Sequence, residues 1–187
     1  MAVLPVFLKL GGRRVLLVGG GRVAAAKLRP LLDVGARVTV IAPVVSTEVA
    51  STGARIFTRE FEPQDLDGVC YVVAAAPKNV NAVVAREATA RGLFVNAVDD
   101  VENASAYAGA VLHRNGVTVA ISTDGAAPAL AGLLREAIDD LLPGDLDRWM
   151  TCAREERVRW LAAKVPMEWR RRLLLDALVR LYPGSAR

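Results

Sequence analysis

Residues 14–42 read RVLLVGGGRVAAAKLRPLLDVGARVTVIA, and this stretch decides the fold of the chain around it. Residues 14–18 are apolar and rich in β-branched side chains, which indicates a buried strand, and the three glycines that follow predict a tight turn. A helix is predicted over residues 23–32, closed by Gly35, and a second buried strand over residues 37–42. A strand, a turn, a helix and a strand within about 30 residues form one βαβ unit, which implies a parallel sheet with a right-handed crossover.

The alternation of strands and helices continues along the chain. Further strands are predicted near residues 55–58, 69–75 and 93–98, and a helix over residues 80–91. Such an alternation over about 100 residues predicts a doubly wound α/β domain. Pro30 lies inside the first helix, and we expect it to kink that helix or to shorten its first half, because proline lacks an N–H and clashes with the preceding turn.

The pattern changes after residue 99. Two strand-like runs, residues 107–112 and 117–122, flank a turn at residues 113–116 (HRNG), and its Asn-Gly pair is a strong hairpin signal. From Pro128 onward the pattern predicts helices over residues 129–142, 146–165 and 167–181.

The composition is that of an ordinary globular protein. The 187 residues are 53% hydrophobic and 24% charged, which excludes disordered, collagenous and coiled-coil classes and allows one domain with an appendage. No run approaches about 18 apolar residues, so we expect no membrane span, and the apolar N-terminus lacks the basic start of a secretory signal, so we expect a cytoplasmic location. Cys70 and Cys152 lie far apart and His113 is the only histidine, so neither a disulfide framework nor a fixed metal site is expected.

The net charge of +4 lies wholly in residues 144–187, because basic and acidic residues balance before them. Such an excess attracts nucleic acid, an anionic surface or a polycarboxylate substrate, and a solvated helix face is the alternative. We expect no nucleic-acid partner, because this tail has no helix-turn-helix spacing and few aromatic residues for stacking on bases. Trp149, Trp160 and Trp169 are expected to anchor helix packing instead.

Residues 19–24 (GGGRVA) match the G-x-G-x-x-A form of the dinucleotide-binding fingerprint. In this motif Gly19 permits the turn, Gly21 lets the backbone approach a pyrophosphate, and a small residue at position 24 lets the helix pack closely on its strand. The helix N-terminus adds free N–H groups and a positive dipole end for the phosphates. The alternatives are a glycine-rich turn without a ligand and, for Arg22, a solvated side chain instead of a phosphate contact.

The second strand ends in Ile41-Ala42-Pro43-Val44, where an Asp or Glu would ordinarily bind the adenosine ribose. We therefore expect backbone groups to hold the ribose. No basic cluster follows the strand to bind a 2′-phosphate, which favours NAD over NADP. The candidate cofactor-binding residues are Gly19, Gly21, Arg22, Val23, Pro43 and Val44.

Five stretches occur in an order that resembles one family. They are LPVF at 4–7, GGGRVAAAK at 19–27, GARVTVIAP at 35–43, VNAVDD at 95–100 and AISTDGAAPALAGLLRE at 120–136. Over about residues 3–142 the chain is similar to the precorrin-2 dehydrogenases of sirohaem synthesis, which occur as stand-alone enzymes and as the N-terminal part of sirohaem synthase.

The resemblance implies that NAD⁺ oxidises precorrin-2 to sirohydrochlorin, and many members also act as a ferrochelatase (a lyase) that inserts Fe²⁺, with Co²⁺ as the alternative metal. It also implies a homodimer with an intertwined dimerisation sheet. We expect a Rossmann-like NAD-binding domain at 1–104, dimerisation strands and a helix at 105–143, and a C-terminal helical domain at 144–187. Because the chain ends at residue 187, the methyltransferase portion of the fused enzyme is expected to be absent.

Asp99 matches the position of the family's catalytic aspartate. It also ends a predicted parallel strand, where open α/β sheets bind their ligands. A carboxylate is ordinarily ionised at neutral pH, so it can take the proton when the macrocycle is oxidised, or pyrrole protons when a metal enters. The alternative is a turn or cap aspartate beside Asp100.

Ser122, Thr123 and Gly125 precede the Pro128 helix and are candidates for binding substrate carboxylates through backbone N–H groups and hydroxyls. The arginines of the tail suit carboxylates as well, although a bias of composition explains them equally.

The sequence departs from the family at residues 105–109 (SAYAG), Asp124, Ala127 and His113, which border the expected tetrapyrrole cleft. These departures leave the dehydrogenase prediction standing but put metal insertion in question. His113 is a candidate proton carrier or iron-approach residue, or a plain turn histidine. A non-catalytic alternative for the whole chain is an NAD-binding regulatory module with a basic partner-binding tail.

Overall fold

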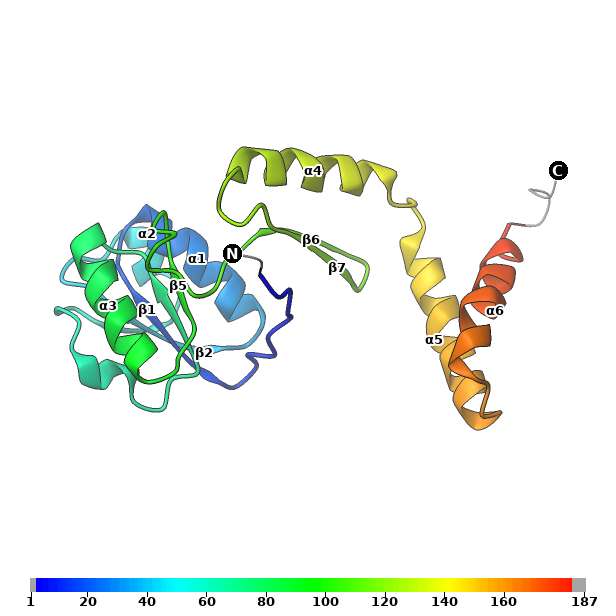
Figure 1. Ribbon diagram of the computed structural model, residues 1–187, viewed down its shortest axis with the longest axis horizontal. Coiled ribbons are helices and arrows are strands. Elements are labelled where there is room, and N and C mark those ends of the chain that lie inside the picture. The colour runs from blue at the N-terminus through cyan, green and yellow to red at the C-terminus, as the bar shows by residue number, and fades with distance from the viewer. Residues whose placement is uncertain (1–2, 183–187) are drawn as a thin grey trace. The chain divides into compact units, whose positions relative to one another are not determined.

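A computed structural model describes residues 3–182 of the protein (Figure 1). The chain divides into two compact units, with the boundary between Ala108 and Gly109. Each unit is described by itself below. Within residues 3–182, no helix has the length and apolar character that crossing a membrane requires.

The first unit is built on one parallel sheet. Its five strands lie in the order β3-β2-β1-β4-β5, and all neighbouring pairs are parallel. The strands are β1 (Arg14–Val18), β2 (Arg37–Ile41), β3 (Arg55–Phe57), β4 (Tyr71–Ala74) and β5 (Val95–Ala97). The chain runs outward from β1 to β3 on one side and then crosses to β4 and β5 on the other. The predicted α/β sheet is confirmed, and the crevice where the order reverses, between β1 and β4, is where such sheets bind ligands.

Helices cover both faces of this sheet (Figure 1). They are α1 (Arg22–Asp33), α2 (Thr47–Ala50), the 3-10 turn η1 (Pro63–Leu66) and α3 (Lys78–Ala90). Successive side chains of a strand point to opposite faces, so Leu17 of β1 packs in one core with Leu28 of α1. Its neighbour Leu16 packs in the other core with Val84 of α3. The short elements α2 and η1 have no periodic signal in the sequence, which therefore does not predict them.

Helix α1 runs through Pro30, which lies in its last turn. Of the two effects expected of Pro30, a shortened helix is therefore wrong, and a kink stays a prediction. Leu28 and Leu31 on either side of the proline are buried, and their burial offsets the one backbone hydrogen bond that proline cannot donate. Gly35 follows the helix with a positive φ of 75°, and its N–H donates to the carbonyl of Leu32 at 2.8 Å.

The second unit begins with an antiparallel hairpin that carries a helix. The hairpin strands are β6 (Ala110–Arg114) and β7 (Val117–Ile121), and α4 (Pro128–Leu141) packs against both. The turn consists of Asn115 and Gly116, whose φ angles of 49° and 83° are those of a two-residue hairpin turn. The predicted hairpin is confirmed.

The strand boundaries of the hairpin differ from those expected. β6 begins at Ala110 and not at residue 107, and His113 lies within the strand, where it pairs with Thr118. The interpretation of His113 as a turn residue is therefore wrong. The cause is the tight Asn-Gly turn, which needs only two residues and leaves His113 and Arg114 to the ladder.

Two further helices, α5 (Leu146–Ala162) and α6 (Met167–Val179), form an antiparallel pair. Trp160 is buried, and the Trp149 indole N–H donates to the Tyr182 hydroxyl at 2.7 Å, so both anchor the pair as expected. Trp169 is 58% exposed, so its expected anchoring role is wrong. The cause is that α6 contributes no buried residue within the described part of the chain.

Candidate functional site

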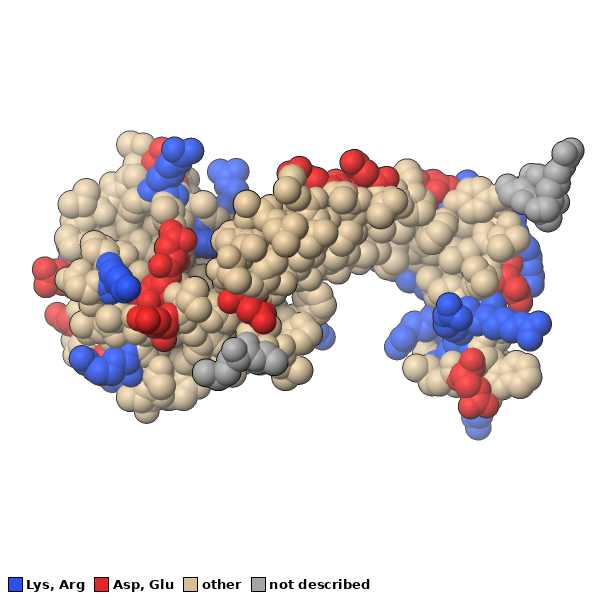
Figure 2. Space-filling model, turned by 45° about the horizontal axis from the view of Figure 1, so that its top comes forward, with Lys and Arg blue, Asp and Glu red and all other residues tan. Residues whose placement is uncertain are grey.

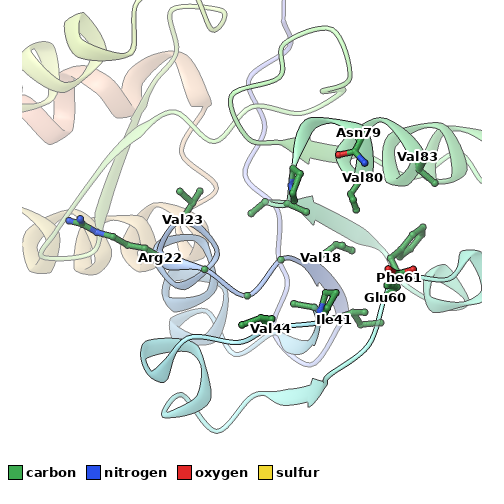
Figure 3. A pocket seen from close by; sticks show the side chains of 18 residues that line it. Val18, Arg22, Val23, Ile41, Val44, Glu60, Phe61, Asn79, Val80 and Val83 are labelled. Atoms are coloured by element: carbon green, nitrogen blue, oxygen red, sulfur yellow. The ribbon is translucent and has the colours of Figure 1, made fainter.

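A cavity of about 790 Å³ opens at the C-terminal edge of the sheet, within the first unit (Figure 3). Its size is that of a pocket for a small molecule or a cofactor. Four segments line it, namely the turn after β1, the end of β2, the loop after β3 and the connection from β4 into α3. The predicted cofactor residues Gly19, Gly21, Arg22, Val23, Pro43 and Val44 all line this one cavity.

The first two glycines of the turn are required by the packing of the backbone around them. Gly19 has a φ of 131°, and a Cβ there would collide with the carbonyl oxygen of Ala75. A Cβ on Gly20 would collide with the carbonyl oxygen of Val44. These two positions let the turn pass closely between the ends of β4 and β2, so both are explained without a ligand.

Gly21 is different, because the fold does not need it. Its φ is −87°, which any residue adopts, and a Cβ added there would meet no atom within 4 Å. Gly21 is the N-cap of α1, no side chain caps this helix end, and its first turn carries no acidic residue. Free backbone N–H groups and the positive end of the helix dipole therefore border the cavity, an arrangement that fits the pyrophosphate of a dinucleotide.

The rest of the cavity is mostly apolar, and within residues 3–182 only two ionisable side chains line it. Arg22 stands at the glycine turn, and Glu60 stands in the loop after β3 (Figure 3). Phe61, which follows Glu60, joins Val80 and Val83 of α3 in an apolar wall. Sequence reasoning missed Glu60 and Phe61, because no motif marks them and only the pairing of β3 with β2 brings them to the cavity.

Asp99 lies at the same edge of the sheet, one strand beyond β4. The N–H of Val98 donates to the carbonyl of Ala74 at 2.9 Å, so the chain is tied to β4 up to the residue before Asp99. The N–H of Ala75 in turn donates to the carbonyl of Val18 at 2.8 Å, which ties β4 to the strand that carries the glycine turn. Asp99 is exposed and has a positive φ of 56°, a strained backbone conformation of the kind found at functional sites.

The segment after Asp99 folds back on β5. The N–H of Val95 donates to the Ser105 hydroxyl at 2.9 Å, and the Asn96 side chain donates to the carbonyl of Ala106 at 3.0 Å. Ser105 and Ala106 are positions where the sequence departs from the family pattern. Both form hydrogen bonds with the edge strand β5. The Oδ1 atom of Asn96 is buried without a hydrogen-bond partner among residues 3–182.

In the second unit, the structure brings three of the four substrate candidates together. The Ser122 hydroxyl accepts from the N–H of Asp124 at 3.1 Å, and the Thr123 hydroxyl accepts from the N–H of Ala127 at 3.2 Å. Gly125 completes this turn with a φ of 78°. Both hydroxyls keep a hydrogen to donate, but the N–H groups of positions 124 and 127 are engaged within the turn.

His113 lies apart from this turn. It pairs with Thr118, which precedes Ser122 by four residues along the extended chain, so it lies about 13 Å from the turn at Ser122. Its ring is exposed, and Nδ1 contacts the Thr118 hydroxyl at 3.0 Å.

Basic side chains of the second unit gather on its last two helices. Figure 2 shows Lys and Arg side chains on α5 and α6. Several of them are exposed and engaged only by neighbours on the same helix, as is Arg159 with Glu156. Among the described residues no group of three or more His, Cys, Asp and Glu side chains could hold a metal ion.

Comparisons with known proteins agree with this architecture. A family described as putative NAD(P)-binding matches residues 6–110, and a family described as sirohaem biosynthesis protein central matches residues 114–141. The chain is 43% identical to siroheme synthase 1 of Aeromonas salmonicida, over 95% of this chain and 40% of the relative. It is 40% identical to the siroheme synthase of Photorhabdus laumondii, over 91% of this chain and 37% of the relative. The chain thus spans about two fifths of the length of these curated relatives.

One solved structure is similar over almost the whole chain. It is the structure of SirC, precorrin-2 dehydrogenase, and it superposes with a TM-score of 0.72 at 28% sequence identity. The similarity covers 93% of this chain and 88% of that one, so it includes both units.

Proposed function

Because this chain belongs to the precorrin-2 dehydrogenase family of sirohaem biosynthesis, we propose that it oxidises precorrin-2 to sirohydrochlorin with NAD⁺. The observation that carries the proposal is the shared edge of the sheet. The cavity with the open helix end at Gly21 and the exposed carboxylate of Asp99 both lie at the C-terminal ends of the parallel strands. A cofactor site and a proton acceptor at one edge are what a dehydrogenase needs.

The cofactor fits the residues present. The N–H groups at the start of α1 would hold the pyrophosphate, and Gly21 leaves the space for it. Arg22 adds a positive charge at that end, while Val23, Pro43 and Val44 line the cavity beside it. When bound, NAD⁺ supplies the hydride acceptor.

Asp99 takes the remaining proton. The oxidation removes two hydrogen atoms from the tetrapyrrole, and one leaves as a hydride while the other leaves as a proton. An exposed carboxylate at the end of β5 is placed to accept that proton and to release it to water. Its backbone is fixed up to Val98 by the hydrogen bond to Ala74, so the base is held on a rigid strand end.

The polycarboxylate periphery of precorrin-2 calls for cations and hydrogen-bond donors. The hydroxyls of Ser122 and Thr123 and the open backbone at Gly125 offer donors in one turn, and His113 is a separate candidate. The arginines of α5 and α6 add guanidinium groups that suit carboxylates.

The second unit also supports the proposed homodimer. Leu130, Leu133, Leu134 and Leu141 of α4 are exposed, and the first three follow the spacing of one helix face. Val111 of β6 adds to the exposed apolar surface. A second copy of the chain that covers these residues would bury them, and Leu133→Asp, at a position 64% exposed, should then convert dimer to monomer in sedimentation analysis.

The experiment that tests the function supplies purified protein with precorrin-2 and NAD⁺ and follows the absorbance of NADH. Formation of NADH supports the dehydrogenase. The non-catalytic NAD-binding module predicts binding of NAD⁺ in calorimetry with no NADH, and a salt-dependent gel shift with nucleic acid would favour that alternative.

Insertion of Fe²⁺ or Co²⁺ into the product is a separate reaction, with the metal as a substrate, and it stays a prediction. Because the metal also enters sirohydrochlorin spontaneously, the rate with protein must exceed that of a protein-free control. The cytoplasmic location likewise stays a prediction.

A further inference from the structure

The adenosine end of the cofactor cavity has a carboxylate that the sequence pattern does not reveal. Strand β2 is followed by Ala42, Pro43 and Val44, without the acid that ordinarily binds the ribose. The folded chain supplies an acid from elsewhere in the sequence. Glu60 follows the next strand, β3, and lines the same cavity as Pro43 and Val44.

The position of Glu60 follows from the pairing of β3 with β2. The N–H of Ala42 donates to the carbonyl of Phe57 at 3.2 Å, so the two strand ends lie side by side at the edge of the cavity. Glu60 lies three residues beyond this bond. The guanidinium of Arg59 donates to the carbonyl of Glu60 at 2.8 Å and pairs with Asp65, which fixes the backbone at Glu60.

The side chain of Glu60 is free to meet a ligand. It is exposed, and no ion pair or side-chain hydrogen bond of Glu60 occurs within residues 3–182. The nearby Arg59 is already engaged by Asp65, so it does not neutralise Glu60. Figure 3 shows Glu60 beside Phe61, away from Arg22 and the glycine turn.

The charges of the cavity therefore match one orientation of a dinucleotide. The positive helix end at the glycine turn lies where phosphates bind, and the negative charge of Glu60 lies at the other end of the cavity (Figure 3). Phe61, Val80 and Val83 form the apolar wall beside Glu60, which suits a purine ring.

We propose that Glu60 accepts hydrogen bonds from the adenosine ribose hydroxyls of NAD⁺ and repels the 2′-phosphate of NADP⁺, so that it sets the cofactor preference. A carboxylate accepts from hydroxyl donors, and hydrogen bonds to a charged acceptor are stronger than neutral ones. A phosphate on the 2′ position removes the donor and places two like charges together. The inference rests on the proposed function only in taking this cavity as the cofactor site.

The test is titration of the full chain with NAD⁺ and with NADP⁺ by calorimetry, without substrate. We expect Glu60→Gln to weaken NAD⁺ about tenfold and to leave NADP⁺ unchanged or tighter. Glu60→Lys should reverse the preference, because its ammonium would attract the 2′-phosphate. The matched control is Glu62→Gln, which removes the same charge two residues away at a side chain that does not line the cavity.

Each outcome decides the proposal. Equal weakening of both cofactors in Glu60→Gln, or the same change in Glu62→Gln, would overturn it, because the effect would then be one of folding or of general charge. Failure of the wild-type chain to bind either cofactor would overturn both this inference and the proposed function. NAD⁺ binding with the expected Glu60 pattern but no oxidation of precorrin-2 would sink the proposed function alone.

Discussion

Asp99 and Asp100 are neighbours in the chain but lie in opposite environments. Asp99 is exposed, with a left-handed backbone at a φ of 56°, whereas Asp100 is only 5% exposed and accepts a hydrogen bond from Asn103 Nδ2 at 2.8 Å. Asp100 therefore stabilises the loop, and Asp99 is exposed to solvent at the edge of the sheet. Asp99 itself lies in the turn that follows β5, so its catalytic role and the alternative of a turn aspartate both stay predictions.

Replacing Asp99 should abolish catalysis and leave the fold intact. Asn is the cleaner substitution, because Asn tolerates the left-handed backbone at this position, whereas Ala is strained there. We expect Asp99→Asn to lower kcat about 100-fold or more, with the Kd for NAD⁺ and the melting temperature unchanged. In contrast, Asp100→Ala should lower the free energy of unfolding by about 1–3 kcal/mol, since it leaves Asn103 without its partner. Loss of NAD⁺ binding in Asp99→Asn would assign a structural role to Asp99.

Gly21→Asp should weaken the binding of NAD⁺ without lowering the stability of the fold. An Asp at the N-cap of α1 finds open space and caps the first-turn N–H groups, so the melting temperature should stay the same or rise. The same carboxylate would occupy the place of the pyrophosphate and repel it, so we expect NAD⁺ affinity to fall about 100-fold or more. Calorimetry and thermal melts measure both.

Gly20→Ala is the contrasting variant, because its Cβ would collide with the carbonyl oxygen of Val44. It should lower the melting temperature even without cofactor. Unchanged NAD⁺ affinity in Gly21→Asp would contradict the placement of the cofactor.

The buried phenol of Tyr71 should make the protein sensitive to high pH. Tyr71 lies in the core between the sheet and α1, and burial raises its pKa from 10.0 to about 12. The folded state favours the neutral phenol, so this stability is fully present below pH 10 and is lost as the pH rises toward 12. We expect a loss of about 1.4 kcal/mol per pH unit in that window.

Urea unfolding near pH 10 and near pH 12 measures this loss. Other groups titrate in the same range, so the comparison is with Tyr71→Phe, which keeps the ring and lacks the ionisable hydroxyl. A wild-type curve that runs parallel to that of Tyr71→Phe would show that Tyr71 does not carry the effect.

Tyr182 should stabilise the α5–α6 pair. Its hydroxyl accepts from Trp149 Nε1 at 2.7 Å and donates to the Asp145 carboxylate at 2.8 Å, which joins the two ends of the helical pair. We expect Tyr182→Phe to cost about 1–2 kcal/mol and to speed hydrogen exchange of the Trp149 indole N–H in NMR spectra. Tyr107→Phe is the control, since no hydrogen bond of its hydroxyl occurs within residues 3–182. Equal exchange rates in both variants would refute this role.

The features predicted correctly from sequence are those that local patterns determine. The strand at Arg14–Val18, its glycine turn and the helix after it follow from neighbouring residues alone, and the Asn115-Gly116 turn does as well. The grouping of the glycine turn with Pro43 and Val44 in one cavity also follows, because adjacent parallel strands end at one edge.

The features missed depend on contacts between distant segments. Glu60 reaches the cavity only because β3 pairs with β2, and no local pattern encodes that neighbour. The pairing of His113 with Thr118 is missed for a local reason, because the prediction assigns four residues to a turn that needs only Asn115 and Gly116. Pro30 does not shorten α1, because burial of Leu28 and Leu31 against the sheet overrides the local preference of proline.

The most direct measurement is the stoichiometry of the reaction. Purified protein is given precorrin-2 and NAD⁺ without metal and without oxygen, and sirohydrochlorin and NADH are quantified together beside a protein-free control. We predict that the two products form in equal amounts and only with the protein, and that Asp99→Asn forms neither. Sirohydrochlorin formed without NADH, or no product above the control, would contradict the assignment of this chain as an NAD⁺-dependent precorrin-2 dehydrogenase.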